Sequence, residues 1–208
     1  MADVINYAGL CAMLNAATEQ IRANHEMLSR LDGATGDGDH GTTILRAMES
    51  VSKTVSETCG TDTKSLLSAV GWAVMSCDGG STGPLLGSFF VGMSDAADGA
   101  TEWDSTKLAT VIEAGVTKMA KQSRAKVGDK TMMDAFLPAV DALKAATTQP
   151  PKAALQQAAA AAAQGAEATK SMRAKFGRAR NLGERVIGHP DPGAVSVSLI
   201  FKGFSEGL

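Results

Sequence analysis

The chain has 208 residues, a formal net charge of −2 and only 4% aromatic residues. This length can bury a full hydrophobic core without disulfide or metal cross-links. The small net charge excludes a global field that would draw the protein to nucleic acid or to a membrane. The three cysteines, Cys11, Cys59 and Cys77, form no C-x-x-C pair, so neither a disulfide framework nor a structural zinc site is supported.

The N-terminal region lacks the features of a targeting segment. Charged residues are scattered through it, and no apolar h-region is present. Nowhere does the chain approach the ~18 consecutive apolar residues that a membrane span requires. We therefore expect a cytoplasmic protein whose partners are neither nucleic acid nor membrane.

Apolar residues recur at intervals of three, four or seven along most of the chain, as on one face of an amphipathic helix. Five such stripes begin at Leu10, Ile44, Leu66, Leu108 and Met133. Three further segments are expected to be helical: residues 84–95, residues 152–172 with their alanine run, and residues 192–205.

The last of these segments carries two conflicting signals. Val195, Val197 and Leu199 alternate with serines, as in a strand, whereas Asp191 followed by Pro192 is typical of a helix N-cap and first turn. A lone strand would have no partner, so we expect a helix here. The expected fold class is all-α, with about eight helices in a single domain over residues 1–208 and no dividing linker.

Three carboxylates, Asp32, Asp37 and Asp39, fall in one glycine-rich stretch after the first expected helix. Hard divalent cations prefer oxygen ligands, and glycines let the backbone turn sharply enough to direct several carboxylates at one centre. The stretch resembles an EF-hand loop only superficially, because it lacks the closing glutamate. Asp-Gly pairs are also common in turns, so a metal site and a polar turn without ligand both stay open.

Residues 78–84, which include Ser81 and Thr82, lead into a predicted helix. Their glycines expose backbone amides, and the helix N-terminus adds N–H groups and positive partial charge, which together suit a phosphate. No Gly-Lys-Ser/Thr follows, so this is not a Walker motif. An ordinary glycine-rich helix start is the alternative interpretation.

Two more loops complete the set, residues 127–134 and 177–194. A loop as long as the second, inside a compact helical domain, is usually functional or disordered. Its arginines, Arg178, Arg180 and Arg185, are candidate phosphate partners because the guanidinium fork matches phosphate oxygens. For Arg180 and Arg185, a solvated or ion-paired side chain is the alternative.

Four stretches of this chain together resemble, in the same order, the motifs of the nucleotide-binding L subunit of dihydroxyacetone (glycerone) kinases. They are residues 36–41, 79–84, 128–132 and 183–194. The resemblance implies a closed barrel or bundle of eight antiparallel helices with the nucleotide at one rim. It implies two Mg²⁺ ions held by Asp32, Asp37 and Asp39. It also implies nucleotide contacts by His40, Gly41, Thr42, Thr43, Ser81, Thr82, Met132, Arg178, Asp191, Pro192 and Gly193. Ser123 and Val127 depart from the family's usual glycine and proline, near the adenine side.

The resemblance further implies an enzyme that is active only with a separate K subunit. Magnesium-bound ADP or ATP would supply the phosphoryl group, Arg178 would act as the catalytic residue on the phosphates, and dihydroxyacetone would be held on the K subunit. Either ATP or a phosphocarrier M subunit is expected to be the donor. A homodimer also stays open.

Two other classes of function compete with this interpretation. One is a related enzyme complex, such as a kinase subunit for another small ketose or a fatty-acid kinase. The Asp39-His40-Gly41 sequence argues against the fatty-acid kinases, whose loop is of a Gly-Asp-Thr-Gly type. The other class is a non-catalytic helical scaffold that binds nucleotide only to sense it.

Overall fold

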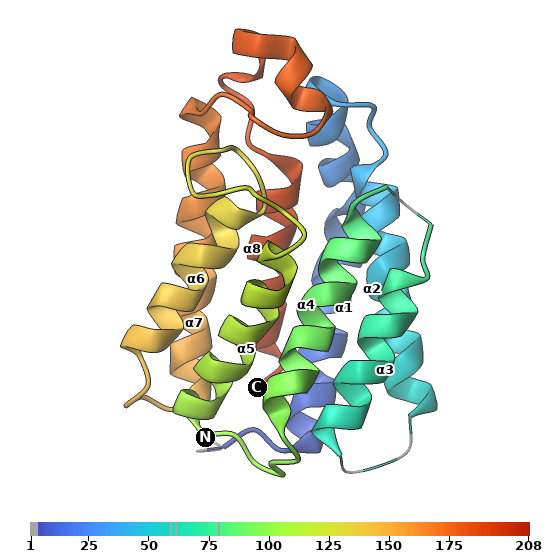
Figure 1. Cartoon of the computed structure of the whole chain (residues 1–208), viewed down its shortest axis with the longest axis vertical. Coiled ribbons are helices and arrows are strands. Elements are labelled where there is room, and N and C mark those ends of the chain that lie inside the picture. Colours follow the sequence, from blue (N-terminus) through green and yellow to red (C-terminus); the bar gives the residue numbers. More distant parts are fainter. Residues whose placement is uncertain (1–3, 59, 61, 79) are drawn as a thin grey trace.

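The computed structural model describes residues 4–58, 60, 62–78 and 80–208, so Cys59 and Gly79 lie outside the described part of the chain. Within that part the regular structure is helical (Figure 1). The elements in chain order are α1 (Tyr7–Thr35), α2 (His40–Glu57), α3 (Thr63–Met75), α4 (Thr82–Ala97), α5 (Ser105–Ala120), α6 (Met133–Ala145), α7 (Pro151–Ala168), η1 (Thr169–Ser171), η2 (Arg178–Val186) and α8 (Pro192–Glu206).

The eight α-helices form a closed ring. Each packs against the next one in sequence, and α8 returns to pack against α1. Figure 1 shows them side by side along the long axis, with consecutive helices running in opposite directions. The expected all-α bundle of about eight antiparallel helices is therefore confirmed.

Aromatic side chains link the helices across the centre of the ring. Phe89 of α4 lies 5.0 Å from Phe136 of α6, centroid to centroid, and Phe136 lies 6.0 Å from Phe201 of α8. Such tilted and edge-on pairs contribute roughly 0.5–1.5 kcal/mol each beyond the area they bury. Between α8 and α1, Gly203 lets the two backbones approach, because a Cβ there would overlap Ala17. The core thus ties α1, α4, α6 and α8 into one rigid support.

The ambiguous segment at the C-terminus is helical, as expected from its cap. The Asp191 side chain accepts a hydrogen bond from the Ala194 amide at 2.8 Å, and Pro192 occupies the first turn. Val197 is buried in the core, while Val195 and Leu199 are half-buried beside it. The alternation that suggests a strand is therefore overridden by packing on one helical face.

The expectation of one long irregular loop over residues 177–194 needs a correction. The structure forms the short 3₁₀ segment η2 there, kinked at Gly183, where φ is 60°. This segment is mostly exposed and Val186 is its only buried residue, so few apolar positions mark it in the sequence. Among the described residues, no helix is long and apolar enough to cross a membrane.

Candidate functional site

Four loops meet at one rim of the ring. They follow α1, α3, α5 and α7, and because consecutive helices are antiparallel, all four emerge at the same end (Figure 1). Residues from all four line one cavity of about 950 Å³. The alternation of helix direction thus gathers segments that lie as much as 160 residues apart in sequence, from Asp32 to Pro192.

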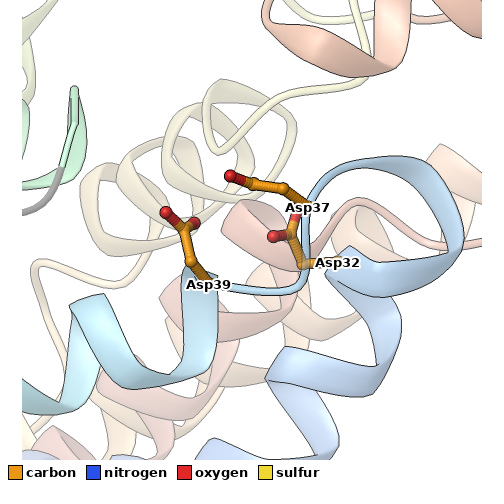
Figure 2. A group of neighbouring side chains, drawn as sticks. All are labelled: Asp32, Asp37 and Asp39. Carbon is orange, nitrogen blue, oxygen red and sulfur yellow. The ribbon is translucent and has the colours of Figure 1, made fainter.

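The last turn of α1, which holds Asp32, and the α1–α2 loop, which holds Asp37 and Asp39, bring three carboxylates together. One oxygen from each of Asp32, Asp37 and Asp39 lies within 4.8 Å of the others, and Figure 2 shows the three side chains converging on one space. Asp32 also holds the loop, because its Oδ2 accepts hydrogen bonds from Gly38 N at 2.9 Å and His40 N at 3.3 Å. Gly38 adopts a φ of 81°, which a side chain would oppose.

Asp39 precedes α2 at the N-cap position, but within the described residues its side chain makes no capping hydrogen bond. Its carboxylate lies instead beside Asp32 and Asp37. Three carboxylates this close repel one another unless a cation lies between them. Their chemistry fits a hard divalent cation, which prefers carboxylate oxygens.

The guanidinium of Arg178, at the start of η2, forms an ion pair with Asp37, and both residues line the cavity. Both side chains are substantially exposed, at 67% and 43%. An ion pair this exposed contributes only about 0–1 kcal/mol, so it can be exchanged for another partner at little cost. Arg178 therefore stands where it can move from the carboxylate to an anion in the cavity.

The start of α4 forms a second wall. Ser81 at the N-cap makes no side-chain capping bond among the described residues, and Ser81 and Thr82 both line the cavity. Gly80 has a φ of 54°, and a Cβ on Gly83 would lie 3.0 Å from the Cys77 carbonyl oxygen. These glycines permit the tight turn into the helix. An uncapped helix N-terminus with exposed N–H groups suits an anion.

The start of α8 forms a third wall, where burial shifts the pKa of two titratable side chains. Burial raises the pKa of the Asp191 carboxyl to about 7, although the Ala194 amide and Lys130 act in the opposite direction. Burial also lowers the pKa of His40, whose Nε2 lies 3.2 Å from Ser196 Oγ. Charges on a ligand placed against this wall would be weakly screened.

Most residues expected at the site line the cavity. They are Asp32, Asp37, Asp39, His40, Thr43, Ser81, Thr82, Met132, Arg178, Asp191, Pro192 and Gly193. Gly41 and Thr42 are not among the lining residues. Gly41 packs against α1, where a Cβ would overlap the His25 carbonyl oxygen, and Thr42 is exposed.

Several lining residues were not singled out from the sequence, among them Gln122, Arg124, Lys130 and Phe176. Arg124 follows Ser123, which departs from the family pattern and does line the cavity, whereas Val127 does not. The basic residue Arg124 next to Ser123 is the feature of the sequence that could have indicated that this loop lines the cavity. For Gln122 and Phe176 no comparable sequence signal exists.

Comparison with known proteins identifies the family of the chain. Residues 34–206 match the family model of the DAK2 domain. The chain is 40% identical over 188 residues to the ADP-binding subunit DhaL of PEP-dependent dihydroxyacetone kinase 1 from Listeria innocua, covering 90% of each protein. It is 34% identical over 179 residues to the corresponding Escherichia coli DhaL subunit, covering 85% of each.

The fold is also similar to a solved structure, the dihydroxyacetone kinase of C. freundii in complex with AMP-PNP and Mg²⁺. The TM-score is 0.75 at 27% identity. The match covers 95% of this chain but only 33% of that one, so the chain spans about a third of that kinase. From the family match and its two relatives of similar length, the chain belongs to the DAK2 domain family.

Proposed function

We propose that this chain, over residues 1–208, is the nucleotide-binding subunit of a dihydroxyacetone kinase. The observation that carries the proposal is the placement of three convergent carboxylates and an uncapped helix N-terminus around one cavity. Those two elements match the two parts of a magnesium nucleotide, its cations and its phosphates. The names of the relatives support this assignment, since they are ADP-binding subunits.

The chemistry follows from the walls of the cavity. Two Mg²⁺ ions on Asp32, Asp37 and Asp39 would neutralise the charge that builds up on the phosphates. The first-turn amides of α4, with Ser81 and Thr82, would hold phosphate oxygens. Phosphoryl transfer depends mainly on such positioning and charge stabilisation, with little covalent work for the protein.

Arg178 has the catalytic role in this proposal. In the structure its guanidinium pairs with Asp37. When a cation occupies Asp37, the guanidinium is released and can bind a phosphate oxygen, for which its fork is well suited. It would then stabilise charge during transfer, as an arginine supplied to a phosphoryl centre commonly does.

The acceptor triose is proposed to lie on a separate K subunit. We assign no histidine of this chain to triose binding. His25 Nδ1 lies 2.8 Å from the Arg22 carbonyl oxygen, His40 contacts Ser196, and His189 is exposed on the rim. The chain would therefore be active only in that complex. The relatives named PEP-dependent favour recharging of bound ADP by a phosphocarrier M subunit over direct exchange with ATP.

The test is reconstitution. The purified chain is mixed with a K subunit, dihydroxyacetone and either ATP or a phosphorylated carrier, and dihydroxyacetone phosphate is measured. Product that depends on both subunits and on Mg²⁺ supports the proposal. Nucleotide binding without product under either donor contradicts it and favours a sensing scaffold. Product only with another small ketose would reassign the substrate, and light scattering on the same samples reports a homodimer.

A further inference from the structure

Lys130 is a buried lysine beside the cavity, with only 3% of its surface exposed. It lies in the turn before α6, and its φ of 59° is left-handed, which is rare for a residue other than glycine. Asp134 holds that turn, since its carboxylate accepts hydrogen bonds from Gly128 N and Thr131 N. The turn therefore fixes Lys130 in a conformation that directs its side chain inward.

The ammonium group of Lys130 binds two backbone carbonyls. Nζ donates to the Thr169 oxygen at 2.6 Å and to the His189 oxygen at 2.5 Å. Neighbouring Asp129 does not compensate for the charge, because it pairs with Lys175 at 2.5 Å. Lysine is almost never fully buried without a partner; burial lowers the pKa of Lys130, whereas the nearby carboxylates of Asp191 and Asp134 act in the opposite direction. The ammonium group thus lies beside these two carboxylates and links two backbone carbonyls that belong to different segments.

These carbonyls belong to two different segments that precede site residues. Thr169 follows α7 as its C-cap and begins η1, and His189 lies two residues before the Asp191 cap of α8. The two segments are also joined directly, because Asp191 N donates to Thr169 Oγ1 at 2.8 Å. Lys130 and Thr169 thus form a tether, defined here as these two residues and their bonds to His189 and Asp191.

The tether holds the start of α8 against the α5–α6 loop. Met132, two residues after Lys130, lies across from Gly193, where a Cβ would be 3.6 Å from the Met132 Cβ. Both Met132 and Gly193 line the cavity. Fixing His189 and Asp191 relative to Lys130 therefore fixes the distance between two walls of the site.

We infer that Lys130 is a positioning residue for the nucleotide, acting through the tether that aligns the start of α8 with the α5–α6 loop. This inference rests on the proposed function, because it takes a magnesium nucleotide as the ligand of the cavity. It assigns a role to a residue in the wall of the site, separate from the metal ligands and from Arg178.

The experiment compares Lys130→Met, Thr169→Val and the double variant with the wild-type chain. Methionine keeps the length of the lysine stem but has no donor, and valine keeps the shape of threonine without its hydroxyl. Two quantities are measured on nucleotide-stripped protein: hydrogen exchange of a peptide spanning residues 186–197, and the Kd for Mg–ADP by calorimetry. All measurements are made at a temperature where circular dichroism shows each variant to be fully folded.

Lys130→Met is expected to speed exchange in that peptide and to weaken Mg–ADP binding about tenfold or more, the usual size for a lost hydrogen bond to a charged group. Thr169→Val should change both quantities in the same direction. The double variant should be less than additive, because both changes break one tether. Lys126→Met, an exposed lysine in the same loop, should change neither.

A second control separates positioning from general destabilisation. Leu143 is fully buried near the end of α6 away from the rim. Leu143→Ala should lower the melting temperature but leave the Kd for Mg–ADP unchanged. If it weakens binding as much as Lys130→Met does, the positioning role is overturned.

Faster exchange with an unchanged Kd would also overturn the positioning role, as would fully additive effects in the double variant. A wild-type chain that binds no Mg–ADP at all would instead overturn the proposed function, and the inference with it. The two failures are therefore distinguishable by the wild-type calorimetry alone.

Discussion

The two ends of the helix ring are built from the same helices but differ in the partners of their polar groups. At the end opposite the rim, loop groups bond to one another: Tyr7 Oη donates to the Thr58 oxygen at 2.9 Å, and Thr63 Oγ1 donates to the Ala100 oxygen at 3.1 Å. The backbones of Ile5 and Trp103 pair in a short antiparallel bridge. These bonds close that end, where Trp103 Nε1 is the one buried side-chain polar atom of the described residues that lacks a partner.

The rim leaves its polar groups facing a cavity. Three carboxylates crowd together there, and the N-terminus of α4 lacks a side-chain cap among the described residues. Both features destabilise the empty protein, since like charges repel and uncapped amides lose a partner. Departures from local consistency of this kind are expected where a ligand completes the site. The comparison predicts that stability depends on one end and ligand binding on the other.

The largest effect is expected at the closed end. Trp103 is fully buried, so Trp103→Ala should lower the free energy of unfolding by about 3–5 kcal/mol, as large-to-small core changes do. The Kd for Mg–ADP, measured where the variant is still folded, should stay the same. Urea unfolding measures the loss of stability, and calorimetry measures the Kd for Mg–ADP. If the alanine variant does not fold, Trp103→Phe supplies the same comparison with a smaller loss, and weakened binding in it would break the division between the ends.

At the rim, Asp37→Ala should weaken ligand binding and leave the fold intact, the reverse of what is expected for Trp103→Ala. Removing one carboxylate from the cluster should weaken Mg²⁺-dependent ADP binding on the order of 100-fold, at the upper end of what changes around a metal site produce. The helical circular-dichroism signal should be retained. Asp98→Ala is the matched control, because Asp98 is an exposed aspartate at the closed end. Unchanged ADP affinity in calorimetry would remove the assignment of the aspartates as metal ligands.

Ligand addition should stabilise the whole chain through the rim alone. A ligand that binds only the folded state adds about 2.7 kcal/mol at a hundredfold excess over Kd. For a chain of this length that corresponds to a rise in melting temperature of roughly 5–11 °C. ADP with Mg²⁺ should give this shift, and ADP with a chelator should give much less. Equal shifts in a thermal scan with and without Mg²⁺ would contradict a metal-mediated site.

Much of this arrangement could be predicted from the sequence, because it depends on local patterns. The spacing of apolar residues predicts the helices, and the cap formed by Asp191 and Pro192 correctly predicts α8 against the alternating valines. The grouping of Asp32, Asp37 and Asp39 also follows from spacing, since all three fall in one short stretch, although Asp32 lies in the last turn of α1 rather than after it. These aspartates are also expected near the other site loops, because alternate connections between antiparallel helices emerge at the same end of the bundle.

Other features depend on contacts between distant segments and leave no local pattern. Lys130 bonds to carbonyls 39 and 59 residues further along the chain, so its burial cannot be deduced from its neighbours. Gly41 belongs to a motif associated with nucleotide contact, yet its missing side chain makes room for α1. The segment η2 offers little apolar surface to reveal it, because Val186 is its only buried residue. In each case the position of the residue is set by packing between elements.

The smallest effect is expected for Arg178→Ala. In the structure this arginine pairs with Asp37, so binding a nucleotide replaces one ionic partner by another. The net loss should therefore be about tenfold in the affinity for Mg–ADP, smaller than for Asp37→Ala, since a charge-assisted bond to phosphate replaces a weak exposed ion pair. The ligand-induced rise in melting temperature should shrink accordingly.

The control for this variant lies on α1, well away from the rim loops. Arg22 is also exposed and ion-paired, with Glu19 and Glu49, so Arg22→Ala removes an equivalent charge without touching the cavity. It should leave the Mg–ADP shift unchanged in parallel thermal scans. If both arginine variants reduce the shift equally, only the overall charge of the chain matters, and Arg178 has no specific role at the phosphates. A reduction confined to Arg178→Ala would place that side chain on the ligand, as its position in the cavity wall beside Asp37 predicts.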